Sequence, residues 1–224
     1  MENKLCRWGI LGAATIARKN WKAIWNAENA TLAAVASRDP SRAQQMVDAC
    51  QQEAPFEPAP RGMKDDKADD KAPRAQTYDE LLASDEVDAV YIPLPTGIRG
   101  EWAVRAAEAG KHVVCEKPCA KSADELERML GACEANNVQF MDGVMFMHSA
   151  RLERLRKTLD DSESVGAIRR VASQFTVRAP DDWFESNIRT DPALEPYGCL
   201  GDLGWYCIRM TLWAMNYEMP QRVV

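Results

Sequence analysis

The chain has 224 residues, 46% of them hydrophobic and 28% charged, which is enough to bury a sizeable core in one large domain or one and a half ordinary ones. Its formal net charge of −6 argues against nucleic acid and anionic membranes as partners, because both require a basic surface. Seven scattered cysteines and only two histidines give no metal-site spacing, so we expect no bound metal and reduced thiols. The sequence shows neither a membrane-spanning run nor a signal peptide, which predicts a cytoplasmic protein.

Strand-like and helix-like segments alternate through the first 141 residues. Short apolar runs predict strands over residues 5–11, 31–36, 87–92, 112–115 and 138–141. Helical spacing and start signals predict helices over residues 15–29, 40–50, 101–109 and 122–136. Thr77 with Glu80, and Ser122 with Glu125, have the spacing of capping boxes at helix starts. This alternation predicts an α/β fold, a doubly wound parallel sheet of the Rossmann type.

Residues 53–75 interrupt the alternation. They hold four prolines, almost no large apolar side chains and a nearly balanced run of charges (KDDKADDK). Such a composition buries too little apolar surface to offset the entropy of ordering the chain. We expect a mobile, charged surface insertion, and a functional lid is the alternative.

The pattern changes after Met141. A basic amphipathic helix is predicted over residues 149–160, a strand over 168–177 and an apolar helix over 201–216. One strand and two helices cannot form a stable sheet domain alone. We therefore divide the chain into a nucleotide-binding domain, residues 1–143, and the start of an incomplete α+β domain, residues 144–224.

The first predicted strand runs into a relaxed dinucleotide fingerprint. A tight turn at this point aims backbone N–H groups and a helix N-terminus at a pyrophosphate. Small side chains are needed where the backbone approaches the phosphates. The candidate cofactor-binding residues here are Gly12, Ala13, Ala14, Thr15 and Ile16. A small-residue turn that binds nothing is the alternative reading of these residues alone.

The end of the second predicted strand bears on the choice of cofactor. NAD-binding folds commonly place an acidic residue there for the ribose hydroxyl, whereas this chain has Ser37 and Arg38. A hydroxyl beside a guanidinium suits a 2′-phosphate. The cofactor is therefore predicted to be NADP, and Asp39 leaves NAD as an alternative.

A further strand ends in Glu116, Lys117 and Pro118, at the sheet edge where open α/β folds bind ligands. A lysine there could hold a substrate hydroxyl and favour its deprotonation. An ordinary surface Glu–Lys pair is the alternative on these residues alone.

Four motifs in this order resemble the Gfo/Idh/MocA oxidoreductase family: the turn at Gly12, the run YIPLPT from Tyr91, AGKHVVCEKP, and GDLGWY from Gly201. The resemblance covers nearly the whole chain outside the insertion. It implies a Rossmann domain followed by a C-terminal domain whose open sheet encloses the substrate and often forms a dimer. It also implies cofactor contacts from Leu94, Pro95, Thr96, Glu116 and Lys117.

The resemblance assigns catalysis to Lys117, Asp202 and Tyr206. The family's Asp-x-Gly-x-His/Tyr motif falls on Asp202, Gly204 and Tyr206, and tyrosine resembles the branch that contains glucose–fructose oxidoreductase and dimeric dihydrodiol (D-xylose) dehydrogenase. Tyr206 would be the general acid/base, assisted by the ammonium group of Lys117. Asn187, Arg189 and Asp202 are candidate substrate contacts. The family's Pro-Asn-x-x-His run is altered here and ends in Arg99.

The resemblance implies an NAD(P)-dependent oxidoreductase that moves a hydride to or from a sugar or cyclic polyol. Family members usually continue for a further hundred residues, so we expect a C-terminally truncated chain whose full-length form is a homo-oligomer through its C-terminal sheet. A non-catalytic NADP-binding relative is the alternative. A third reading is an enzyme that keeps its NADP bound while exchanging two sugars.

Overall fold

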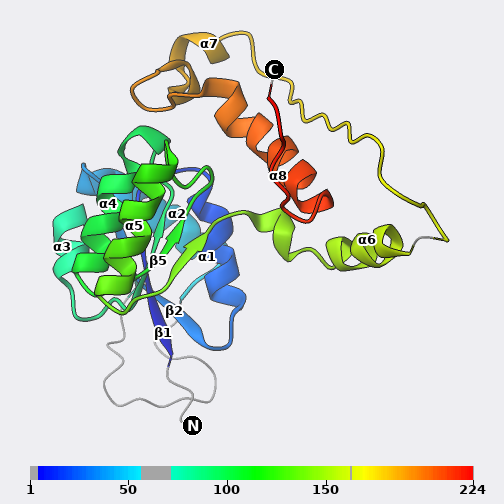
Figure 1. The fold of residues 1–224 in the computed structure, drawn as a ribbon. Coiled ribbons are helices and arrows are strands. Elements are labelled where there is room, and N and C mark those ends of the chain that lie inside the picture. The colour runs from blue at the N-terminus through cyan, green and yellow to red at the C-terminus, as the bar shows by residue number, and fades with distance from the viewer. Residues whose placement is uncertain (1–4, 57–71, 162, 224) are drawn as a thin grey trace. The chain divides into compact units, whose positions relative to one another are not determined.

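The structure, a computed structural model, describes residues 5–56, 72–161 and 163–223. It divides into two compact units, with the boundary after Asp142. Each unit has its own helices (Figure 1). Within the described residues, no helix combines the length and apolar character needed to cross a membrane.

The first unit contains a six-stranded sheet in the order β3-β2-β1-β4-β5-β6. All neighbouring strands pair in parallel. The strands are β1 (Cys6–Leu11), β2 (Ala30–Ala36), β3 (Arg74–Gln76), β4 (Ala89–Ile92), β5 (His112–Cys115) and β6 (Phe140–Asp142). The predicted doubly wound α/β fold is confirmed. Strands β2 and β3 lie on one side of β1 and strands β4, β5 and β6 on the other, so the strand order reverses between β1 and β4.

Helices cover both faces of this sheet. They are α1 (Ala17–Asn26), α2 (Pro40–Glu53), α3 (Tyr78–Ala83), α4 (Thr96–Glu108) and α5 (Ala123–Ala135). Trp21 of α1 and Met46 of α2 belong to the buried cluster on one face of the sheet. Leu81 of α3 and Met129 of α5 belong to a second buried cluster, on the other face. In β4, Val90 and Ile92 belong to one cluster and Tyr91 to the other, which is why this central strand is apolar on both faces.

The predicted helix starts are largely as the sequence indicates. Thr77 and Glu80 form a complete capping box, in which Thr77 N donates to Glu80 Oε2 at 2.8 Å and Glu80 N donates to Thr77 Oγ1 at 3.3 Å. At α5, Ser122 Oγ accepts the Glu125 N–H at 3.2 Å, whereas the Glu125 carboxylate accepts the N–H of Lys121 at 2.7 Å. Glu125 therefore also fixes the loop that precedes its own helix.

Helix α4 begins at Thr96, five residues before its predicted start at Glu101. Two glycines in this stretch made it resemble a loop, since glycine is a poor helix former. Gly100 has a packing reason: a Cβ atom there would lie 2.6 Å from the Glu125 carboxyl group of α5. A glycine at this position therefore lets α4 and α5 approach closely.

The predicted insertion is described only at its ends, because residues 57–71 lie outside the described part of the chain. At one end, Phe56 packs edge-on against Trp21, with ring centroids 5.3 Å apart. At the other, Arg74 and Ala75 belong to β3, which pairs with β2. The sequence analysis missed this strand because a three-residue edge strand with two polar side chains has no apolar signal of its own.

The second unit is helical in its described residues. Its elements are the 3₁₀ helices η1 (Met145–His148) and η2 (Ile188–Thr190), the α-helices α6 (Ala150–Asp160), α7 (Trp183–Ser186) and α8 (Trp205–Ala214), and the π-helix η3 (Leu200–Gly204). The strand predicted over residues 168–177 is wrong, because this segment has no strand partner among the described residues. Alternating polarity alone does not make a strand without a neighbour to complete its hydrogen bonds.

Candidate active site

The turn between β1 and α1 requires glycine. Gly12 has φ +134°, and its N–H donates to Ala36 O at 2.9 Å, which anchors the turn to the end of β2. A Cβ atom at Gly12 would lie 3.0 Å from Leu94 Cδ2. The N–H groups of Ala17, Arg18 and Lys19, the first three residues of α1, already donate to Ala14 O, Thr15 O and Ile16 O. What favours an anion at this end of the helix is therefore the positive end of the helix dipole.

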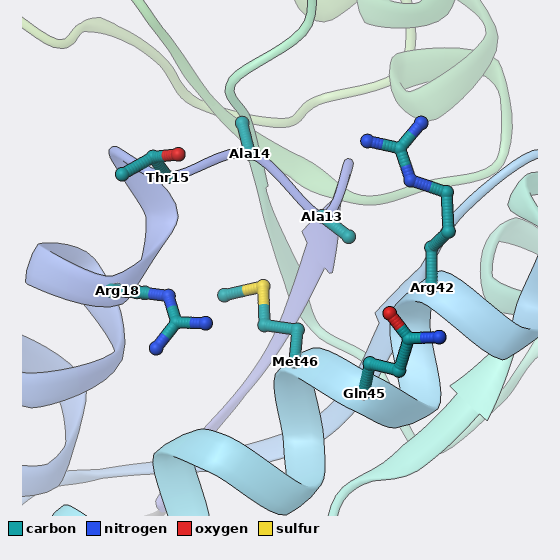
Figure 2. A pocket seen from close by; sticks show the side chains of 7 residues that line it. All are labelled: Ala13, Ala14, Thr15, Arg18, Arg42, Gln45 and Met46. Atoms are coloured by element: carbon teal, nitrogen blue, oxygen red, sulfur yellow. The ribbon is translucent and has the colours of Figure 1, made fainter.

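A pocket of about 160 Å³ opens beside this turn (Figure 2). Ala13, Ala14 and Thr15 form one wall, and Arg18 from α1 and Arg42 from α2 carry guanidinium groups into its surroundings. Gln45 and Met46 complete the lining. Two cations beside a glycine turn and a helix N-terminus fit the phosphates of a dinucleotide.

Substituting Gly12 with alanine is expected to destabilise the chain by about 1–2 kcal/mol, because alanine is strained at this φ and its methyl group displaces Leu94. Urea unfolding measures the change in free energy. Gly131→Ala is the matched control: it lies inside α5 with no atom near its missing Cβ, so alanine should leave stability unchanged or raise it. Equal loss in both variants would contradict the role assigned to Gly12.

The end of β2 presents the residues predicted to choose the cofactor. Ser37 is buried, and its N–H donates to Gln76 O at 3.0 Å, whereas Arg38 is exposed. Asp39 caps α2, since its Oδ1 accepts the Ser41 N–H at 2.9 Å. Hydrogen bonding to Ser41 lowers the pKa of Asp39. Asp39, the acidic residue that kept NAD as an alternative cofactor, therefore serves as the N-cap of α2.

The loop after β4 faces the glycine turn. Leu94 is buried and fills the space that a side chain at Gly12 would need. Pro95 immediately precedes α4, and Thr96 lies in its first turn with a side chain that is only 1% exposed. Leu94 and Thr96 therefore shape this loop from within.

The turn after β5 carries the candidate catalytic lysine. Lys117 is half-buried and is joined to Pro118 by a cis peptide bond. Glu116 is buried, and its Oε1 accepts the hydroxyl of Tyr91 at 2.7 Å. Burial, and then the negative charge of Glu116, raise the pKa of Tyr91 well above its usual range, so Tyr91 stays a hydrogen-bond donor.

Sheet order brings these turns together. Leu11 pairs with Ala36 at the ends of β1 and β2, and Ile92 pairs with Cys115 at the ends of β4 and β5. Since β2, β1, β4 and β5 are consecutive parallel strands, the four turns that follow them lie next to one another along the carboxyl edge of the sheet, where the strands end. This edge contains the point where the strand order reverses, the usual ligand site of open α/β sheets.

The second unit brings three other candidates together. The guanidinium group of Arg189 forms an ion pair with the carboxylate of Asp202, and Arg189 N donates to Asn187 Oδ1 at 3.1 Å. Asp202 lies in the π-helix η3, a form that is often found at functional sites. Tyr206 follows in α8, with its ring centroid 5.8 Å from that of Phe146 and 5.2 Å from that of Phe175.

The sequence analysis missed Arg18 and Arg42 as neighbours of the glycine turn. Arg18 follows Thr15 by three positions, and Arg42 follows Arg38 by four. Thr15 and Arg18 both fall in the helix predicted over residues 15–29, where this spacing places them on one face, so helical periodicity could have found Arg18. Arg42 could have been found only as a cation in the first turn of the helix that follows Arg38.

Comparison with known proteins agrees with this arrangement. Residues 6–144 match the model of the oxidoreductase family with an NAD-binding Rossmann fold, and residues 153–224 match the GFO/IDH/MocA C-terminal domain. D-xylose 1-dehydrogenase (NADP(+)) 2 of Haloferax volcanii is 35% identical over 202 residues, which cover 90% of this chain and 54% of that protein. The scyllo-inositol 2-dehydrogenase (NADP(+)) IolU of Bacillus subtilis is 38% identical, over 58% of this chain and 39% of that protein.

A solved structure is similar over both units. KijD10, a 3-ketoreductase from Actinomadura kijaniata in complex with NADP and TDP-benzene, has 27% sequence identity and a TM-score of 0.77, covering 95% of this chain and 58% of KijD10. The chain thus spans a little over half the length of the D-xylose dehydrogenase and of KijD10. With a six-stranded parallel sheet, a glycine turn at its edge and matches to both family models, the chain belongs to the Gfo/Idh/MocA family of oxidoreductases.

Proposed function

We propose that this chain takes part in NADP-dependent hydride transfer between the nicotinamide and a hydroxyl or carbonyl carbon of a sugar or cyclic polyol. The observation that carries the proposal is the sheet edge at which the Gly12 turn, Arg38, Leu94 and Lys117 follow four consecutive strands. Relatives named for xylose, scyllo-inositol and a dTDP-linked didehydro-dideoxyglucose support the substrate class.

The residues at this edge fit the parts of NADP. The Gly12 turn and the N-terminus of α1 would hold the pyrophosphate, helped by the other turn residues Ala13, Ala14, Thr15 and Ile16. Ser37 and Arg38 would hold the 2′-phosphate, and Arg42 would add a second guanidinium group. The use of Asp39 as a helix cap supports NADP over NAD.

The loops after β4 and β5 would face the nicotinamide. Bound nicotinamide supplies the hydride acceptor or donor. Leu94, Pro95, Thr96 and Glu116 would shape its site, and Lys117 would hold a substrate hydroxyl beside it. Most side chains of these loops are buried, so the loops would form a wall that helps to exclude water from the bound nicotinamide.

Proton transfer is assigned to Tyr206 together with Lys117. A phenol has an ordinary pKa of about 10, too high for ready proton abstraction at neutral pH, and a neighbouring ammonium group favours the phenolate. Asp202 would bind a substrate hydroxyl, with Arg189 and Asn187 beside it as further substrate contacts. The ion pair with Arg189 would fix the carboxylate orientation.

Two measurements test the proposal. Titration with NADPH and NADH, followed by nicotinamide fluorescence, should show tighter binding of NADPH. Incubation with NADP and a panel of aldoses and inositols should produce NADPH absorbance. Binding without turnover would favour a non-catalytic NADP-binding protein, and bound NADP that is reduced but never released would favour exchange between two sugars. Absence of binding to either nucleotide would overturn the proposal.

We further propose a cytoplasmic location and, for the full-length form, a homo-oligomer joined through its C-terminal sheet. All seven cysteines are free thiols, which suits a reducing compartment. The second unit exposes large apolar side chains that an assembly would cover, among them Phe184, Leu200 and Ile208. Light scattering of the full-length protein tests the assembly, and a monomer at micromolar concentration would contradict it.

A further inference from the structure

Arg99 is a buried cation at the sheet edge that the proposed function does not use. It lies in the first turn of α4, and only 4% of its surface is exposed. A buried arginine needs partners that satisfy its N–H donors, because an unpaired buried charge is strongly unfavourable. The identity of those partners therefore indicates what Arg99 does.

Its partners are backbone carbonyl groups of the two loops that would face the nicotinamide. Arg99 Nε donates to Leu94 O at 2.7 Å, in the loop after β4. Arg99 Nη1 donates to Glu116 O at 2.8 Å and to Pro118 O, on either side of Lys117. One planar guanidinium group thus links both loops and holds the lysine turn from both flanks.

The surroundings of Arg99 favour a fixed guanidinium group. The carboxylate of Glu116 lies in the same buried region, where it accepts the Tyr91 hydroxyl. Arg99 and Glu116 act on the pKa of Tyr91 in opposite directions, so all three groups lie within electrostatic range.

We propose that Arg99 is a positioning residue that holds the backbone of Lys117 in register with the Leu94–Thr96 loop. The inference rests on the proposed function, because it gives Lys117 its purpose. Arg99 does not touch the reacting atoms; it acts through the carbonyl groups of Glu116 and Pro118. A displacement of about 1 Å at a reacting group can lower a rate by about 100-fold, so the link should matter for turnover.

The test compares Arg99→Met with Arg105→Ala. Methionine keeps much of the buried volume of Arg99 and removes all its donors. Arg105 is a control arginine on the same helix: its guanidinium group pairs with the Asp79 carboxylate and stacks over the Trp102 ring, so its loss breaks no hydrogen bond to the two loops. Arg99→Lys keeps the buried charge without the planar fork, and it carries the comparison if Arg99→Met does not fold.

Hydrogen exchange of backbone amides gives a readout that is independent of turnover. In Arg99→Met, exchange in residues 93–99 and 115–121 should rise together, by about tenfold, because hydrogen bonds that join the two segments are lost. Residues 40–53, which form α2, should exchange as in the wild type. Arg105→Ala should leave the two segments unchanged.

Kinetics give the second readout. Arg99→Met should lower kcat by about 10- to 100-fold while KM for the sugar changes little, since the lysine is misplaced but the rest of the pocket remains. The kcat of Arg99→Lys should lie between that of the wild type and that of Arg99→Met. If the wild type turns over no substrate, the proposed function fails, and the exchange experiment still decides the role of Arg99. Wild-type exchange in either segment, or an unchanged kcat, would overturn the inference.

Discussion

Substitution of Lys117 by methionine is expected to lower kcat by about 10²- to 10⁴-fold, the range for removal of a positioned acid–base group. Methionine retains much of the length of the side chain but loses the ammonium group that would hold the substrate hydroxyl. NADPH binding should change by less than about threefold, because the proposed phosphate contacts would come from other turns. Steady-state turnover and fluorescence titration measure the two quantities.

Lys121→Met is the matched control for this prediction. Lys121 lies four residues further on, is similarly half-buried, and donates to Gly97 O and to the Glu125 carboxylate. Its loss should affect stability more than chemistry. Full activity in Lys117→Met would remove this lysine from the mechanism, and an equal loss of kcat in both variants would indicate a general disturbance of the loop.

Arg38→Ala is expected to weaken NADPH binding by about 10- to 100-fold while NADH binding changes little. The reason is that a guanidinium group forms strong charge-assisted hydrogen bonds with a 2′-phosphate, which NADH lacks. Arg38 is exposed at the end of β2, so its removal should leave the fold intact. Fluorescence titration with both nucleotides, at two salt concentrations, gives the ratio of dissociation constants.

Arg74→Ala serves as the control for this experiment. Arg74 is also exposed and lies on the neighbouring edge strand β3, but its guanidinium group pairs with Glu86 at 2.8 Å. Its loss should not change the preference between the nucleotides. Equal weakening of NADPH and NADH binding in Arg38→Ala would contradict the 2′-phosphate assignment, and it would move the arginine to a phosphate shared by both.

The sequence was sufficient to predict the fold of the first unit, because buried parallel strands and amphipathic helices have strong local patterns. It also located the turns of the site, since Gly12 and Pro118 mark chain reversals. It missed β3, whose residues become a strand only by pairing with β2. It was wrong over residues 168–177, where the alternation of Phe175 and Val177 meets no neighbouring strand in the described part of the chain.

Within the site, the sequence could identify residues next to a recognisable turn but not those that reach it from elsewhere. Arg18 and Arg42 lie beside the glycine turn because their helices begin there, and the buried Arg99 reaches the loops after β4 and β5. An arginine can be buried where the folded chain has backbone carbonyl groups without other hydrogen-bond donors. The position of such carbonyl groups depends on the tertiary structure, so the sequence pattern does not reveal it. The Arg189–Asp202 ion pair, by contrast, joins two residues that motif and loop position had already selected.

Leu94 joins two parts of the site that are usually considered separately. Its side chain occupies the space beside Gly12, and its carbonyl oxygen accepts a hydrogen bond from Arg99. A shift of Leu94 would therefore change the packing against the glycine turn and, through Arg99, the position of the lysine turn. Free-energy changes from substitutions at Gly12 and Arg99 should then be non-additive, as expected for residues coupled through a shared partner.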